Sequence, residues 1–160
     1  MNIWRLITHH ECADEALAWY RAHQCVCIGW EAVGNVQEKA YQGAADIGLV
    51  ISEAYPELQN AAMGGPTLWN FYYHVKLGDL ILLRHDNHNQ AVVEVKGNYD
   101  WKQDSDDGSD LLDGYPHMRR VKFTARSPDE LWAATDWAPG QNQRWTLARR
   151  TLVGLAPTAA

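Results

Sequence analysis

The feature of this sequence that most constrains its fold is a series of short motifs in which aromatic residues and glycines stand where strands or helices would end. Eight of the 160 residues are tryptophan, more than core packing ordinarily needs, because each buried indole N–H requires a hydrogen-bond partner. Aromatic side chains at strand ends can line a pocket at one mouth of a small β-rich fold, where flat ligands such as nucleobases are held by stacking. The motifs occupy residues 25–30, 68–72, 76–79, 97–101 and 119–123.

Hydrophobic periodicity predicts a mixed succession of strands and helices. Apolar runs and period-two alternation favour strands at residues 3–7, 25–30, 79–84, 90–99 and 119–124, with a hairpin turn at 85–89. Helical spacing favours helices at residues 11–23, 44–55, 64–78 and 144–155, and a capping box at 127–130 begins a short further helix.

About five or six short strands with helices between the early ones predict an α+β fold of one domain, residues 1–160. A strongly bent sheet that closes as a small pseudo-β-barrel, with helices packed outside, fits this order better than a doubly wound sheet. No glycine-rich phosphate loop follows any of the expected strands.

Charge and cysteine content narrow the classes of partner. A formal net charge of −6 argues against nonspecific coating of nucleic acid but leaves room for a local basic face. Residues 104–110 concentrate acid, whereas arginines gather late in the chain. Three cysteines, an odd number, and no leader-like start predict a reducing, cytoplasmic setting. No apolar run has membrane-spanning length, so no membrane partner is expected.

The order of these motifs carries a family resemblance. A strand and a helix are followed by an Ile28-Gly29-Trp30 strand, two helices ending in Gly78-Asp79, a hairpin, Tyr99, and a strand over residues 119–123. This order resembles EVE-type domains of the PUA-like superfamily, which are related to YTH domains and to the modified-cytosine-reading modules of methylation-dependent restriction systems. The resemblance covers residues 3–124, and residues 125–160 are expected to form a C-terminal helical extension.

The resemblance favours a binding module over an enzyme. It implies no cofactor, no metal and no catalytic residue. It implies a small pseudo-barrel whose pocket receives a flipped, modified base, with modified cytosine in DNA expected first and RNA as the alternative. A partner nuclease or a fused nuclease domain is implied, although the domain could also act alone as a sensor. The matching positions place Trp30 on one wall, the segment from Tyr99 through Asp100 to Trp101 on the other, and Arg120 against the nucleic-acid backbone.

The chemistry of base reading extends this set of candidate residues. A flat aromatic face stacks on the base, a polar group selects its edge, and cations hold the phosphates. The stacking candidates are Trp30, Tyr99, Trp101 and Tyr115, the edge candidates are Asn98, Asp100 and Asn35, and the phosphate candidates are Arg119, Arg120, Lys122 and Arg144.

Two alternatives remain open at this stage. Asp79 before one strand and Glu94-Val95-Lys96 on the next match the short pattern of Mg²⁺-dependent nucleases of the PD-(D/E)xK type, in which two carboxylates bind the metal and the lysine positions water. The same residues also suit a turn after a helix and an exposed cross-strand ion pair. The third class is a small-molecule or protein-interaction module that uses the same aromatic pocket.

Overall fold

The computed structural model describes residues 1–8, 12–102 and 115–153 as an α+β fold built on one open seven-stranded sheet. The strand order is β2-β5-β4-β3-β1-β7-β6. The pairing of β1 with β3 is parallel, and the other five strand pairs are antiparallel. The strands are β1 (Ile3–Ile7), β2 (Cys25–Ile28), β3 (Leu80–His85), β4 (His88–Trp101), β5 (His117–Phe123), β6 (Thr135–Trp137) and β7 (Leu147–Leu152).

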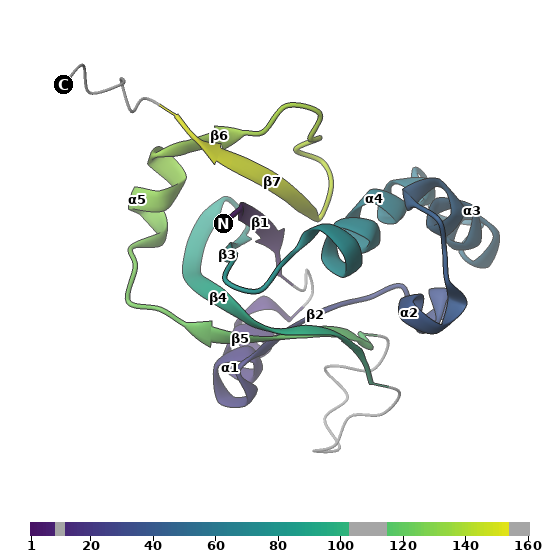
Figure 1. Ribbon diagram of the computed structural model, residues 1–160, viewed down its shortest axis with the longest axis horizontal. Helices are drawn as coiled ribbons and strands as arrows, with labels where there is room; N and C mark the ends of the chain where they lie inside the picture. Colours follow the sequence, from purple (N-terminus) through teal and green to yellow (C-terminus); the bar gives the residue numbers. More distant parts are fainter. Residues whose placement is uncertain (9–11, 103–114, 154–160) are drawn as a thin grey trace.

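The helices cover the sheet from several sides. Figure 1 shows the sheet curling from β6 and β7 at the top, through β1, β3 and β4, to β5 and β2 at the bottom, with α4 inside the open side of this curve. None of the described helices is long and apolar enough to cross a bilayer. The helices are α1 (Ala13–His23), α2 (Val36–Lys39), α3 (Ala44–Ala54), α4 (Gly64–Trp69) and α5 (Pro128–Ala133), with shorter turns η1 (Glu31–Val33), η2 (Ala61–Met63) and the π-helical η3 (Asn70–His74).

Two hydrophobic clusters lie on the two faces of the sheet. The larger joins the inward side chains of β1 and β3 to α1, α3 and α4, with Trp4 and Phe71 almost completely buried in it. The smaller lies on the outer face, where Leu131 of α5 contacts Ile3 and Leu82. Side chains of successive strand residues point to opposite faces, so β1 and β3 contribute to both clusters.

Most elements agree with the expectations from sequence. The five predicted strands correspond to β1–β5, and the helices expected at residues 11–23 and 44–55 correspond to α1 and α3. Ser127 Oγ accepts a hydrogen bond of 3.2 Å from the Glu130 N–H, which confirms the N-terminal cap of α5. The hairpin turn is also confirmed, since Asp86 and Asn87 both adopt positive φ, 49° and 61°, as a type I′ turn requires.

The expectation of a helix at residues 144–155 is wrong. Leu147–Leu152 forms β7, which pairs with β1 and β6, so the described part of residues 125–160 supplies α5 and two strands to the sheet rather than a helical extension. The period-two pattern is obscured because Arg150 is buried, only 5% exposed, where an apolar residue would be expected. The acidic segment at residues 104–110 lies outside the described residues.

The buried carboxylate of Asp79 fastens the starts of β1 and β3 together. Its Oδ1 accepts a hydrogen bond of 2.9 Å from the Asn2 N–H, and its Oδ2 accepts bonds from the Trp4 indole Nε1 at 3.0 Å and the Lys76 N–H at 2.9 Å. The side chain is 2% exposed. These three hydrogen bonds satisfy buried donors, so the Asp79 carboxylate has a structural role.

We therefore expect Asp79→Ala to lower the free energy of unfolding by about 3 kcal/mol, because it leaves buried donors without an acceptor. Urea denaturation followed by tryptophan fluorescence measures this loss. The matched control is Glu94→Ala, which removes an exposed carboxylate and should leave the urea midpoint unchanged. Equal effects of the two variants would contradict the role given to Asp79.

Candidate functional site

A cavity of about 580 Å³ lies where β1 and β2 end. Its volume falls in the range of small-molecule sites, about 300–1,000 Å³. Trp30 and Tyr115, two of the residues expected to form a base pocket, border the same cavity. Its polar and aromatic lining residues are Thr8, Trp30, Glu31, Tyr55, Tyr115 and Thr146.

Trp30 is held in an unusual backbone conformation at the edge of this cavity. Its φ of 67° and ψ of 50° lie in the left-handed region, which costs a bulky residue about 1–3 kcal/mol and is often found at binding sites. The ring of Tyr55 meets the indole edge-on, with 5.4 Å between the centroids. A Cβ added at Gly64 would lie 2.8 Å from Trp30 Cε2, so the absence of a side chain there makes room for the indole.

A chain of hydrogen bonds fixes the backbone of Trp30 from behind. His117 Nε2 lies 3.1 Å from the Trp30 carbonyl oxygen, and because a carbonyl only accepts, Nε2 carries the hydrogen. His117 Nδ1 is then the acceptor for the Tyr99 hydroxyl at 2.7 Å, and the Tyr99 oxygen accepts from the Val36 N–H at 3.1 Å. Every polar atom of the relay has a partner, which stabilises one orientation of the Trp30 peptide.

Burial sets the protonation state of this relay. It lowers the pKa of His117 to about 4, against the opposing effect of the hydrogen bond to Trp30. It raises the pKa of Tyr99 well above its ordinary value. Both side chains are therefore neutral at pH 7, as the hydrogen-bond directions require.

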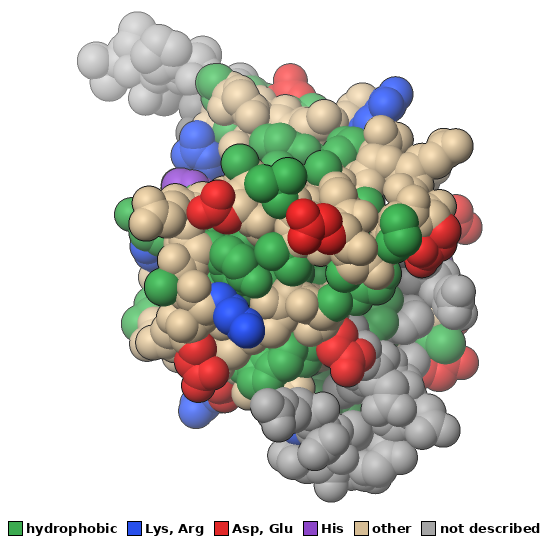
Figure 2. All heavy atoms as spheres, turned by 90° about the vertical axis from the view of Figure 1, so that its right-hand side faces the viewer, with side chains coloured by type: hydrophobic (Ala, Val, Ile, Leu, Met, Phe, Trp, Pro, Cys, Tyr) green, Lys and Arg blue, Asp and Glu red, His purple; other side chains and the backbone are tan. Residues whose placement is uncertain are grey.

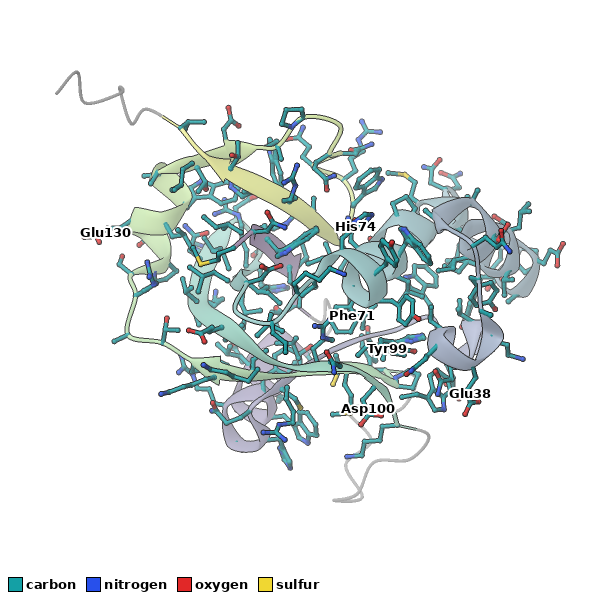
Figure 3. The ribbon with its side chains drawn as sticks, in the orientation of Figure 1. Glu38, Phe71, His74, Tyr99, Asp100 and Glu130 are labelled. Carbon is teal, nitrogen blue, oxygen red and sulfur yellow. The ribbon has the colours of Figure 1, made fainter. Side chains whose placement is uncertain are left out.

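The segment expected as the second pocket wall supports this relay instead of facing Trp30 across the cavity. Tyr99 is buried beside Phe71, with ring centroids 6.5 Å apart, whereas Asp100 lies on the outer side of β4 (Figure 3). The Trp101 ring packs edge-on against His117 at 5.1 Å. Tyr99 and Asn98 border a different cavity of about 570 Å³, together with Arg119.

Asn35, the remaining edge candidate, caps a helix. Its side-chain oxygen accepts from the backbone N–H groups of Gln37 and Glu38 at the start of α2, at 3.0 and 3.4 Å. This amide satisfies donors that the helix itself leaves free.

The candidate phosphate-binding residues do not form one cluster. Arg119 is 2% exposed, and its guanidinium donates to the carbonyls of Gly97, Phe71 and Val75 at 2.8–2.9 Å, so it holds the end of η3. Burial lowers the pKa of Arg119 to about 10. The other candidates are exposed, and they are Arg120, Lys122 and Arg144.

The face formed by α2, α3 and α4 also offers few cations. Figure 2 shows this face with hydrophobic side chains and carboxylates spread over it and few Lys or Arg side chains. Phosphates of a nucleic acid would gain little there.

Sequence reasoning missed several residues of the first cavity. Thr8 follows the β1 strand with no motif around it, yet it is 2% exposed and its hydroxyl has no hydrogen-bond partner within the described chain. Glu31, Tyr55 and Thr146 come from a turn, a helix end and a strand start that are far apart in sequence. Periodicity could not have predicted that Tyr55 lies beside Trp30, because the two residues are far apart in sequence and share no local pattern.

The residues of the nuclease pattern do not converge. Asp79 points toward Trp4 in the larger cluster, whereas Glu94 pairs with Leu80, whose side chain lies on the opposite face of β3. Glu94 forms an exposed ion pair with Lys96, and no three His, Cys, Asp or Glu side chains of residues 1–8, 12–102 and 115–153 come together as a metal site. Asp79 and Glu94 therefore cannot bind one Mg²⁺ ion together in this fold, and the predicted nuclease arrangement is wrong.

Comparison with known proteins identifies the family of the chain. Residues 4–149 match the family described as Domain of unknown function (DUF8426), and the chain belongs to that family. A search of the curated proteins found no match. The matched range begins at the second residue of β1, ends within β7 and includes all of the cavity lining described above.

The buried His117 predicts a pH dependence of stability. The unfolded chain, with a His pKa near 6.5, takes up a proton before the folded chain does. We expect the free energy of unfolding to fall by up to about 3 kcal/mol as the pH decreases from 6.5 to 4. Urea unfolding of the parent and of His117→Gln across this pH range measures the contribution of His117 to the free energy of unfolding, which the variant should lack. Parallel pH curves of the two proteins would contradict this contribution.

The packing of Gly64 against Trp30 gives a second prediction. Gly64→Ala should displace the indole or Ile51, because the new Cβ would lie within 3 Å of both, and should lower the free energy of unfolding by about 1–3 kcal/mol. Near-ultraviolet circular dichroism should report the changed tryptophan environment. Gly43→Ala is the matched control, since nothing lies within 4 Å of its added Cβ; a spectral change in both variants would argue against a specific clash.

Proposed function

We propose that this chain is a nucleic-acid-binding module that reads a modified base by receiving it, flipped out of its strand, in the cavity beside Trp30. The observation that carries the proposal is one arrangement: three aromatic residues, Trp30, Tyr55 and Tyr115, border a cavity that is also lined by Thr8, whose buried hydroxyl has no partner among the described residues. Binding alone would accomplish the recognition, without metal or covalent change.

Stacking supplies the affinity in this proposal. A base stacked on an aromatic side chain gains about 1–3 kcal/mol. Trp30 is prepared for this contact, since the His117 bond, Gly64 and Tyr55 restrict it before any ligand arrives. A group ordered in advance loses less entropy when the ligand binds.

Two polar groups supply the selection of the base. The Thr8 hydroxyl can donate to a ring nitrogen or carbonyl of the base, and the Glu31 carboxylate can accept from an exocyclic amino group. Cytosine presents this combination, and adenine shares its amino group. These groups support modified cytosine as the first candidate and N6-methyladenine as the comparison, with DNA preferred to RNA.

The curled sheet with helices around it supports the pseudo-barrel and the EVE-type resemblance in residues 3–124. Under that resemblance the chain works in the cytoplasm, alone or with a nuclease partner or domain. The alternative occupant of the same cavity is a small molecule or a peptide, which would bind without any preference among oligonucleotides.

The test is a fluorescence titration in EDTA with oligonucleotides that carry either the unmodified or the modified base. We expect saturable quenching that favours a modified base, and we expect Trp30→Phe to weaken the affinity about tenfold. Trp69→Phe is the matched control, because Trp69 stacks on Tyr73 away from the cavity. Equal affinity of the two variants, or no response of the parent to any oligonucleotide, would contradict base reading in this cavity.

Thr8 provides a prediction in which stability and binding change in opposite directions. Thr8→Val removes a buried hydroxyl that has no partner in the described chain, so the free energy of unfolding should rise by about 1 kcal/mol while ligand affinity falls. Thr135→Val is the control and should lower the free energy of unfolding, because the Thr135 hydroxyl donates to Leu131 O and accepts from Arg150 Nε. Thermal unfolding measures both variants, and a destabilised Thr8→Val with normal binding would refute the role of Thr8.

A further inference from the structure

Another cavity, of about 540 Å³ and separate from the one beside Tyr99, opens where the parallel strands β1 and β3 end. Ligands of α/β proteins commonly bind beyond the carboxyl ends of parallel strands. This cavity is polar and basic in character, unlike the aromatic cavity beside Trp30. Its lining is Arg5, Ile7, Arg84, His85, Asp86 and Asn87.

Arg5 brings an unsatisfied donor to this cavity. The side chain is 5% exposed. Its Nη1 and Nη2 donate to the Gln143 carbonyl at 3.3 Å, and Nη2 also donates to the Trp145 carbonyl. The remaining donor, Nε, is buried and has no partner in the described chain, and the same is true of His85 Nδ1. Buried polar atoms of this kind are rare in native proteins, so each one calls for a ligand or another explanation.

The cations here lack ion-paired carboxylates among the described residues. Arg84 donates to Asn89 Oδ1 at 2.5 Å and lies over the Trp132 ring at 3.9 Å. Burial, followed by the charges of Arg150 and Arg84, lowers the pKa of Arg5 to about 10. Repulsion between buried cations is costly, and an anion between them would relieve it.

The carboxylates of the described residues near this cavity are few and lie at its margins. Asp86, in the hairpin turn, is exposed and is the one acidic residue of residues 1–8, 12–102 and 115–153 that borders the cavity. Asp136 acts electrostatically on Arg150, and Asp129 accepts from Asn89 Nδ2 at 2.9 Å. None of them forms an ion pair with Arg5 or Arg84 in the described chain.

We propose that this cavity binds a phosphate group, with Arg5 Nε, the Arg84 guanidinium and the His85 ring directed at its oxygens. A guanidinium matches the geometry of phosphate with parallel N–H donors, and hydrogen bonds between charged groups are about twice as strong as neutral ones. The cluster is distinct from Arg119, Arg120, Lys122 and Arg144, which the sequence suggested for phosphate binding.

The position of the cavity indicates that the phosphate belongs to a nucleotide whose base lies beside Trp30. This assignment rests on the proposed function. Ile7 borders both cavities. The loop before β7 also joins them, because the Gln143 and Trp145 carbonyls hold Arg5 while Thr146 borders the cavity beside Trp30. A base in the first cavity and its own phosphate in the second would make one continuous nucleotide site across the end of β1.

The first experiment tests the phosphate site without any base. Thermal unfolding is followed with increasing inorganic phosphate against chloride at equal ionic strength. The parent should gain about 5 °C at saturation, by preferential binding to the folded state. Arg84→Gln and His85→Phe should lose most of this gain, and Arg120→Gln, an exposed arginine outside both cavities, should keep it. Arg84 and His85 are chosen over the more deeply buried Arg5, whose removal could prevent folding.

An equal gain in the parent and in both cavity variants would overturn the phosphate site, since general salt effects act on all variants alike. The same conclusion follows if phosphate has no effect on the parent.

The second experiment tests the source of the phosphate, using a nucleoside and its 5′-monophosphate that carry the base preferred by the parent. We expect the monophosphate to bind about tenfold more tightly, and Arg84→Gln to abolish this preference. Trp30→Phe should weaken both ligands and preserve the preference. If neither ligand binds while the phosphate response remains, the base proposal and the assigned source fail and the phosphate site stands.

Discussion

The parallel pairing of β1 with β3 is the constraint on which the rest of the structure depends. It is the one parallel pair among the described strands, and it brings the carboxyl ends of β1 and β3 to the same edge of the sheet. Asp79 secures this pair at its start through bonds to Asn2 and Trp4. Ile7 pairs with Arg84 where these two strands end, so Thr8 and Arg84 lie near each other in the fold and border two separate cavities.

The two cavities have complementary chemistry. The first offers aromatic faces, a hydroxyl and a carboxylate, which suit a flat base with an amino group. The second offers buried cationic donors, which suit a phosphate. The relay from Val36 through Tyr99 and His117 to Trp30 contributes indirectly, since it fixes the peptide from which the main aromatic side chain projects. Tyr99 and His117 are therefore positioning residues, whereas Trp30 borders the cavity directly.

The sequence predicted local features better than it predicted the partners of each side chain. Alternation and apolar runs predicted β1 to β5, and the capping residues predicted α5, because those signals lie within a few residues of each other. The strand β7 was missed because Arg150 is buried against Trp132 and Trp137, so a polar residue occupies a core position and the alternation disappears. Tertiary contacts override local propensity in such a segment.

For the site, the sequence placed Trp30 and Tyr115 among the pocket candidates, and both border one cavity, yet it could not distinguish pocket residues from the residues that support them. Tyr99 and Trp101 follow a glycine within a strand just as pocket residues would, but beyond the register shift between Val95 and Tyr99 both side chains contact His117. Arg5 was unrecognised because an arginine in an alternating strand normally faces water. Its burial depends on carbonyls from residues 143 and 145, more than a hundred positions away.

An NMR titration of the indole N–H signals of the eight tryptophans shows directly whether a base binds beside Trp30. A short oligonucleotide with a modified cytosine is added, and each signal is assigned with Trp→Phe variants. We expect the Trp30 signal to shift most, while the signals of Trp4 and Trp69, which lie outside both cavities, stay in place. An unchanged Trp30 signal at saturating oligonucleotide would contradict the claim that a base binds at the end of β1.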